Sequence, residues 1–256
     1  MLIKADASAL EWRSAVFLSQ DKVGIREIIE GLDQHTHNQL TFGLPSRLIA
    51  KTFVFRLIYG GSAYSYAHDV NFDGIGNEKF WQGVIDKFYE KYNDLAKWHI
   101  SLMQTVSATG KLIIPTGREF LFKQYPNFRG EMEWPRTQIL NYPVQGYSAD
   151  LMKLARIAAY NRISKKYGDR ALFIATVHDD VELDVNINLS LDEDREMLYN
   201  ICMELEQVFK DIPTLYEKYF KQPFNVPMSG EVSYGMTLAK MINFKQEEEI
   251  SKCIFK

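Results

Sequence analysis

The spacing of apolar residues predicts a chain that mixes helices with short strands. Helical spacing recurs in residues 11–19, 34–42, 46–59, 62–68, 192–210 and 214–220. Two longer helices are expected, one at residues 80–110 and one from Pro135 to Tyr167 with an interruption near Pro143 and Gly146. Short β-rich runs predict strands at residues 2–7, 111–114, 119–123, 171–177, 181–185 and 226–234. This pattern indicates an α+β fold with a mainly antiparallel sheet.

Acidic residues stand at the ends of two of these predicted strands. Asp6 ends the first strand, and His178, Asp179 and Asp180 form the tip of the hairpin at residues 171–185. Two carboxylates on adjacent strands can share Mg²⁺ with substrate phosphates. Taken singly, each position has a structural explanation, since Asp6 can cap a helix and the Asp179–Asp180 pair can fill a turn.

The predicted helix at residues 46–59, opened by Pro45, has four residues spaced four apart. Arg47, Lys51, Phe55 and Tyr59 drift only about 40° per step and therefore share one face, and Gly60 follows them. We call these four residues the ladder. Two cations followed by two aromatic rings suit a nucleoside triphosphate. The alternative is a solvated amphipathic face, as in a structural or interaction protein.

Composition narrows the class of protein only slightly. The chain has 256 residues, 46% hydrophobic and 25% charged, which is typical of an ordered protein with a substantial core. Its net charge of -3 does not indicate a nucleic-acid binder, although a local basic groove could come from Lys153, Arg156, Arg162, Lys165 and Lys166. Two cysteines exclude a disulfide framework. With no signal-peptide pattern or long apolar run, we expect a cytoplasmic protein without membrane partners.

Four stretches in order along the chain resemble the family A DNA polymerases, the group of bacterial DNA polymerase I and its phage relatives. Asp6–Arg13, Arg47–Gly60 and Val177–Asp180 are similar to motifs A, B and C, and Asn141–Asp150 is similar to the segment between B and C. The resemblance extends weakly to Glu231. It implies a DNA-directed DNA polymerase, a nucleotidyltransferase that extends a primer in DNA replication.

The resemblance also implies a domain organisation. It predicts palm at residues 1–32, helical fingers at 33–110, palm again at 111–235 and a C-terminal tail at 236–256. Within this tail, the charged residues 245–256 are expected to form a frayed, solvated helix, and docking of the missing portion is the alternative. We expect the thumb and the exonuclease of the family to be absent from this chain. We therefore expect a partner polypeptide that supplies the thumb and upstream palm. A phage source is expected, with function in the bacterial host cytoplasm.

The resemblance assigns roles to individual residues. Catalysis would depend on Asp6, Asp179 and Lys51, with Lys51 as proton donor to pyrophosphate. Two Mg²⁺ ions would be bound by Asp6, the Ala7 carbonyl, Asp179 and Asp180. The deoxynucleoside triphosphate would contact Glu11, His35, Arg47, Lys51, Phe55 and Tyr59. Primer–template DNA would contact Gly60, Asn141, Gln145 and His178.

Some positions refine or weaken this assignment. Within the family, Phe55 implies discrimination against dideoxynucleotides and Glu11 implies exclusion of the ribose 2′-hydroxyl. Asp180 stands where the family usually has glutamate, and Thr137 stands where it usually has arginine. His35 can also be an ordinary surface histidine. A second hypothesis is an inactive nucleic-acid-binding remnant, which would bind DNA without metal-dependent nucleotide binding.

Overall fold

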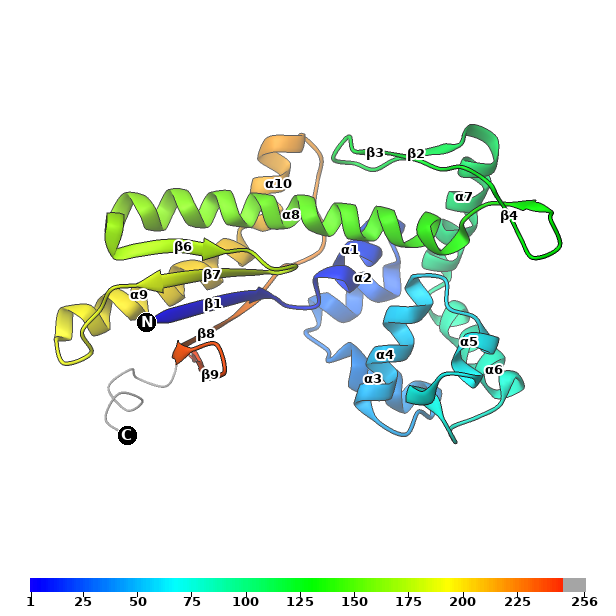
Figure 1. Cartoon of the computed structure of the whole chain (residues 1–256), viewed down its shortest axis with the longest axis horizontal. Helices are drawn as coiled ribbons and strands as arrows, with labels where there is room; N and C mark the ends of the chain where they lie inside the picture. The colour runs from blue at the N-terminus through cyan, green and yellow to red at the C-terminus, as the bar shows by residue number, and fades with distance from the viewer. Residues whose placement is uncertain (246–256) are drawn as a thin grey trace. The chain divides into compact units, whose positions relative to one another are not determined.

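A computed structural model describes residues 1–245. The chain divides into two compact units, one made of Met1–Leu10 with the chain from Ser148 onward, the other of Glu11–Tyr147. These boundaries differ from the sequence-derived subdomain limits, and the assignment of palm and fingers stays a prediction. The α+β class and the antiparallel sheet are confirmed (Figure 1).

The first unit is built on a five-stranded sheet in the order β6-β7-β1-β8-β9. The strands are β1 (Leu2–Ala7), β6 (Ala171–Ala175), β7 (Asp180–Val185), β8 (Gly230–Thr237) and β9 (Lys240–Asn243). Every pairing between neighbours is antiparallel. β1 lies in the centre, so its alternation places Ile3 and Ala5 on the buried face and Lys4 and Asp6 on the other.

Helices cover the buried face of this sheet. α9 (Asp192–Lys210) packs on β1 and β8, and α10 (Ile212–Phe220) packs on α9. The unit also contains the 3₁₀ turn η2 (Gly168–Arg170), which contacts β6, and the part of α8 (Arg136–Tyr167) from Ser148 on. The apolar stripe of α9, with Leu198, Ile201 and Leu205, is almost fully buried. Burial of these side chains orders the sheet that carries Asp6 and Asp179.

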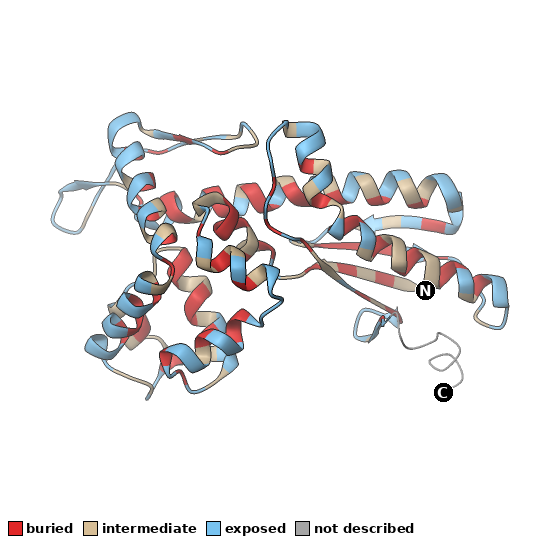
Figure 2. Cartoon of the chain, turned by 180° about the vertical axis from the view of Figure 1, so that it is seen from behind, coloured by how far each residue is buried: buried red, intermediate tan, exposed pale blue. Residues whose placement is uncertain are grey.

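The second unit is mainly helical. Its helices are α1 (Leu10–Ser19), α2 (Lys22–Ile29), α3 (Gln34–Phe42), α4 (Arg47–Ile58), α5 (Ala63–Ala67), η1 (Val70–Phe72), α6 (Glu78–Lys91) and α7 (Asn93–Thr109). Two small hairpins, β2 (Lys111–Ile113) with β3 (Glu119–Leu121) and β4 (Tyr125–Pro126) with β5 (Met132–Glu133), precede α8. Buried residues concentrate on the inner sides of these helices (Figure 2).

Aromatic rings form the core behind the ladder helix α4. Phe53, on the buried side of α4, stacks on Trp81 with centroids 5.8 Å apart and contacts Tyr66 at 5.1 Å. Tyr66 in turn donates its hydroxyl to the Phe53 carbonyl at 2.9 Å. All three side chains are fully buried. They hold one face of α4 against α5 and α6, so the ladder is left on the other face.

The single helix predicted at residues 80–110 is wrong, because it breaks at Tyr92 into α6 and α7. Tyr92 leaves the helical conformation with φ -102° and ψ 64°. Its hydroxyl donates to Glu27 at 2.7 Å and to Asn38 at 3.0 Å. The first N–H groups of α7, at Asp94 and Leu95, donate to the buried Asp21 carboxylate at 3.1 Å each. Long-range contacts therefore stabilise the break.

Other boundaries also differ from prediction. Pro143 lies inside α8, which is continuous where an interruption was expected. Ser46, with Pro45 before it, is the N-cap of α4 and accepts from the Ile49 N–H at 3.2 Å. The strand expected from residue 226 begins at Gly230, since Pro227 has no N–H for a ladder.

Further elements were missed by the sequence pattern. They are α2 and the small strands β4, β5 and β9, and β9 lies in the predicted tail. Most of the charged segment at residues 245–256, for which we expected a frayed helix with docking as the alternative, lies outside the described residues. Across residues 1–245, no helix combines the length and hydropathy needed to cross a bilayer.

Candidate functional site: a carboxylate pair and a cationic-aromatic helix

Backbone pairing in the first unit brings two predicted metal ligands to the same end of the sheet. In the antiparallel register, Asp6 lies opposite Asp180 on β7 and opposite Glu231 on β8. The Ala7 N–H donates to the Asp179 carbonyl at 3.0 Å, which ties the end of β1 to the turn between β6 and β7. Two residues far apart in sequence thus become neighbours.

The turn that carries Asp179 has an uncommon backbone. His178 has φ +54°, a left-handed conformation that few residues other than glycine adopt. The turn is closed by the Asp180 N–H, which donates to the Val177 carbonyl at 3.0 Å. The Val177 N–H donates back to Asp180 Oδ1 at 3.1 Å. These two bonds hold the strained turn in place.

Electrostatics around Asp6 indicate a crowded anionic site. Burial, followed by the negative charge of Asp179, raises the pKa of Asp6 to about 6, while the ammonium of Lys4 acts in the opposite direction. A bound cation would relieve this repulsion. Within residues 1–245, no group of three or more His, Cys, Asp and Glu side chains forms a ready-made metal cage. Two carboxylates without a full cage fit Mg²⁺, which keeps positions for substrate oxygens.

Lys4 is a component of this site that the sequence reasoning missed. Its Nζ lies 2.7 Å from Asp180 Oδ2, and the Asp180 side chain is only 7% exposed. A signal was present, because Lys4 precedes Asp6 by two residues and a strand places such residues on one face. Its partner could not be identified without the register of β1 against β7.

In the second unit, α4 carries Arg47, Lys51 and Phe55 of the ladder, and Tyr59 follows as the C-cap residue. Lys51 Nζ lies 5.8 Å from the centroid of the Phe55 ring. The His35 ring, from α3, lies 5.8 Å from the Phe55 ring, so His35 lies beside the ladder. Burial and the nearby charge of Arg47 lower the pKa of His35 to about 4. The buried His35 Nδ1 has no hydrogen-bond partner among the described residues.

Arg47 is paired with a carboxylate that we had not assigned. Arg47 Nε lies 2.6 Å from Asp33 Oδ2, and Nη2 lies 3.2 Å from Oδ1. Asp33 also caps α3, accepting from the His35 N–H at 3.1 Å and from the Thr36 hydroxyl at 2.8 Å. The Arg47 contact holds the pKa of Asp33 well below its ordinary range. A guanidinium in this position can exchange a carboxylate for a phosphate.

The C-terminal end of the ladder meets the start of α8. Gln145 Nε2 donates to the Tyr59 hydroxyl at 2.7 Å and to Glu11 Oε1. Burial and the Glu11 carboxylate raise the pKa of Tyr59. Gly60 has φ +89°, a backbone conformation that favours glycine, and a Cβ there would lie 3.3 Å from Leu140 Cδ1, which is a tight contact. Asn141 lies one turn before Gln145 on the same helix.

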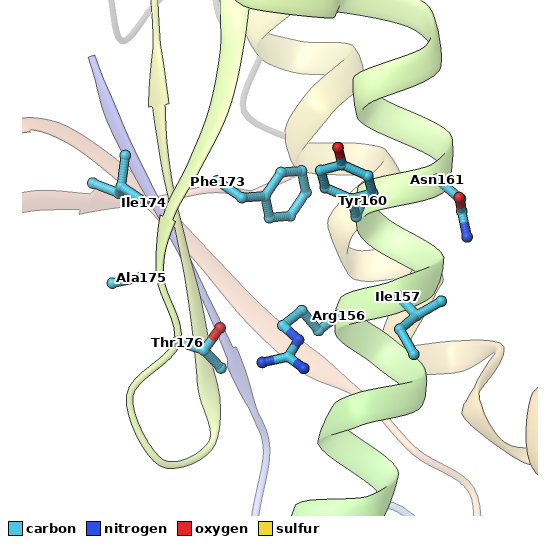
Figure 3. Close-up of a pocket in the computed structure, with 8 residues that line it drawn as sticks. All are labelled: Arg156, Ile157, Tyr160, Asn161, Phe173, Ile174, Ala175 and Thr176. Atoms are coloured by element: carbon cyan, nitrogen blue, oxygen red, sulfur yellow. The ribbon is translucent and has the colours of Figure 1, made fainter.

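A groove lies between α8 and the edge strand β6 in the first unit. It has a volume of about 540 Å³ and is lined by Arg156, Ile157, Tyr160, Asn161, Phe173, Ile174, Ala175 and Thr176. Figure 3 shows Arg156 and Thr176 pointing toward one another, near the strand end that leads to His178. Of the predicted basic cluster, Arg162 is paired with Glu204 at 3.0 Å and Asp211 at 2.7 Å.

The predicted site residues therefore fall into two groups, one in each compact unit. The first unit contains Asp6, Ala7, His178, Asp179 and Asp180. The second contains Glu11, His35, Arg47, Lys51, Phe55, Tyr59, Gly60, Asn141 and Gln145. Within each unit the residues of a group are neighbours or share an element.

Known proteins resemble this chain over most of its length. The thermostable DNA polymerase I of Thermus filiformis is 28% identical over 244 residues, and that of Thermus aquaticus is 29% identical over 247. Each match covers 92% of this chain and 26% of the relative. DNA polymerase I of Pseudomonas aeruginosa is 29% identical over 198 residues, which are 73% of this chain and 21% of the relative.

A solved structure has the same fold. It is the POL domain of Pol1 from M. smegmatis in complex with DNA primer-template and dNTP, with a TM-score of 0.71 and 22% identity. The match covers 92% of this chain and 39% of that one. The sequence model for DNA polymerase family A matches residues 1–240, nearly the whole chain. The chain therefore belongs to DNA polymerase family A.

Proposed function

We propose that this chain is the catalytic palm and fingers portion of a DNA-directed DNA polymerase. The observation that carries the proposal is the juxtaposition of Asp6 and Asp179 through the bond from the Ala7 N–H to the Asp179 carbonyl at 3.0 Å. Membership of DNA polymerase family A supports it. The solved structure of similar fold holds primer-template DNA and dNTP, which supports the same two ligands here.

Asp6, Asp179 and the Ala7 carbonyl would hold two Mg²⁺ ions. Bound there, the ions would activate the primer 3′-hydroxyl and stabilise the charge of the leaving pyrophosphate. The primer 3′-hydroxyl would lose its proton to solvent, and its oxygen would form a bond to the α-phosphorus as the bond to pyrophosphate breaks. Lys51 would give a proton to the pyrophosphate oxygen.

The ladder would bind the incoming deoxynucleoside triphosphate. Arg47 and Lys51 supply positive charge for the phosphates, and the buried Nδ1 of His35 is one more polar atom on that side. Phe55 would stack on the sugar and base. Glu11, held by Gln145 beside Tyr59, would block a ribose 2′-hydroxyl.

Primer-template DNA would contact the start of α8 and the β6–β7 turn. Gly60, Asn141 and Gln145 would lie beside the nascent pair, and His178 would contact the primer. The Arg156 guanidinium, in the groove of Figure 3, is suited to a backbone phosphate.

We also propose a partner polypeptide for this portion of the enzyme. This chain spans 26% of the length of the Thermus polymerases that it matches. We propose that the partner carries the thumb and upstream palm, and that the complex acts in the cytoplasm of a bacterial host of a phage. A purified chain that extends primers processively as a monomer would contradict the need for a partner.

The test is Mg²⁺-dependent primer extension by the chain alone and with any polypeptide encoded beside it. Asp179→Asn should abolish extension by removing a metal ligand with little change in shape. Asp184→Asn, an exposed position on β7, is the matched control and should leave extension unchanged. DNA binding without extension, unaffected by Asp179→Asn, would instead support the inactive remnant.

A further inference from the structure

Both carboxylate oxygens of Asp180 already have partners. Oδ1 accepts the Val177 N–H at 3.1 Å, and Oδ2 lies 2.7 Å from Lys4 Nζ. With its side chain only 7% exposed, Asp180 has little room to turn toward another ligand. A metal ion that approached Asp180 would compete with the turn bond and with Lys4 for the same two carboxylate oxygens.

Lys4 supplies positive charge among several carboxylates. It shares a face of β1 with Asp6 and lies opposite Glu182 in the register with β7. Its ammonium interacts electrostatically with Asp180, Asp6 and Glu182. Lys4 therefore neutralises Asp180 while leaving Asp6 and Asp179 as the anionic pair.

We propose that Lys4 and Asp180 form a positioning pair that fixes the turn carrying Asp179 and keeps Asp180 out of the metal coordination sphere. This inference rests on the proposed function, because it assigns metal binding to Asp6 and Asp179. The aspartate in place of the usual glutamate is thus a structural partner of Lys4, and the pair acts on catalysis only through the position of Asp179.

Mn²⁺ binding tests, without any turnover, whether Asp180 is excluded from the metal coordination sphere. It can be measured by calorimetry and by the electron paramagnetic resonance of free Mn²⁺. Lys4→Met should raise Mn²⁺ affinity about 3- to 10-fold, because one positive charge near the site is lost. Lys4→Met with Asp180→Asn removes both charges and should bind Mn²⁺ within about 2-fold of wild type. Asp179→Asn should lower the affinity more than about 10-fold, as expected for a lost ligand.

The variant with both Lys4→Met and Asp180→Asn decides whether Asp180 is a metal ligand. A loss of Mn²⁺ affinity in the double variant as large as that of Asp179→Asn would show that Asp180 is a ligand, and would overturn the proposal. An unchanged or lowered affinity in Lys4→Met would also overturn it. Because the double variant leaves no unpaired buried charge, it avoids the folding defect that Lys4→Met can introduce.

Amide hydrogen exchange tests the positioning part separately. Lys4→Met should speed exchange at Val177 at least about 3-fold, with no change at Leu183 in the middle of β7, and Lys4→Arg should restore the wild-type rate at Val177. Unchanged exchange at Val177 would refute the role in fixing the turn. Equal Mn²⁺ binding by wild type and Asp179→Asn would refute the proposed function. The exchange rate at Val177 would still show whether Lys4 and Asp180 fix the turn.

Discussion

The bidentate contact between Arg47 and Asp33 leads to a prediction about nucleotide affinity. Without a nucleotide, the guanidinium that is proposed to hold the triphosphate is bound to a carboxylate through Nε at 2.6 Å and Nη2 at 3.2 Å. Binding of a phosphate by Arg47 must therefore compete with Asp33. Asp33→Asn removes this competition, and because asparagine is also a good N-cap, it keeps the start of α3 intact.

The size of the expected gain in nucleotide affinity follows from the solvent exposure of the Arg47 and Asp33 side chains. The Arg47 and Asp33 side chains are 55% and 45% exposed, so solvent screens the pair and its contribution to stability is about 0.2–1 kcal/mol. Release of Arg47 can favour nucleotide binding by no more than this amount. At about 1.4 kcal/mol per tenfold, the expected gain in affinity is about 1.4- to 5-fold for Asp33→Asn.

Two assays on the same proteins check this reasoning. Calorimetric titration with dTTP and Mg²⁺ measures affinity, and urea unfolding measures stability. Asp33→Ala is the matched control, because it also loses the cap and should cost about 0.5–2 kcal/mol more than Asp33→Asn. A loss of dTTP affinity in Asp33→Asn equal to that in Arg47→Ala would refute the competition and show that Asp33 orients Arg47 in the complex.

Three further predictions concern the cap, the buried histidine and the groove. Ser46→Ala should lower the free energy of unfolding by about 1 kcal/mol through loss of the bond to the Ile49 N–H, measured in urea. His35 has its pKa lowered to about 4, so the unfolded chain binds more protons between pH 4 and 6.5; its contribution to stability should rise with pH across that window and then level off. The difference between wild type and His35→Gln in unfolding at several pH values checks this sign, and a midpoint near 6.5 in an NMR titration of His35 would contradict it. Arg156→Ala should weaken primer-template binding and reduce the slope of log affinity against log salt by about 1, measured by fluorescence anisotropy.

Features that depend on local periodicity could be predicted from the sequence. The ladder needs only four-residue spacing on a helix, and the strand ending at Asp6 needs only a short apolar run. Both are present at the expected residues, as α4 and β1. The hairpin with Asp179 at its tip was also predictable, because polar residues separate two β-rich runs.

Features that depend on tertiary contacts could not be predicted from the sequence. The break at Tyr92 interrupts a continuous apolar pattern and is stabilised by Glu27 and Asn38, more than 50 residues away in sequence. The contact of Lys4 with Asp180 requires the register of two strands, and that of Arg47 with Asp33 requires the angle between two helices. Sequence spacing contains neither quantity, so these partners appear only in the folded chain.

The position of Asp6 on the central strand links the demands of folding and of chemistry. Its carboxylate is partly buried beside Asp179, and its raised pKa means that its charge at neutral pH disfavours the folded state. Neutralisation by Asp6→Asn would therefore make a more stable but inactive chain. Under the proposed function, selection for thermostability alone would remove this charge and selection for polymerisation would retain it, which is a trade-off between stability and activity within a single side chain.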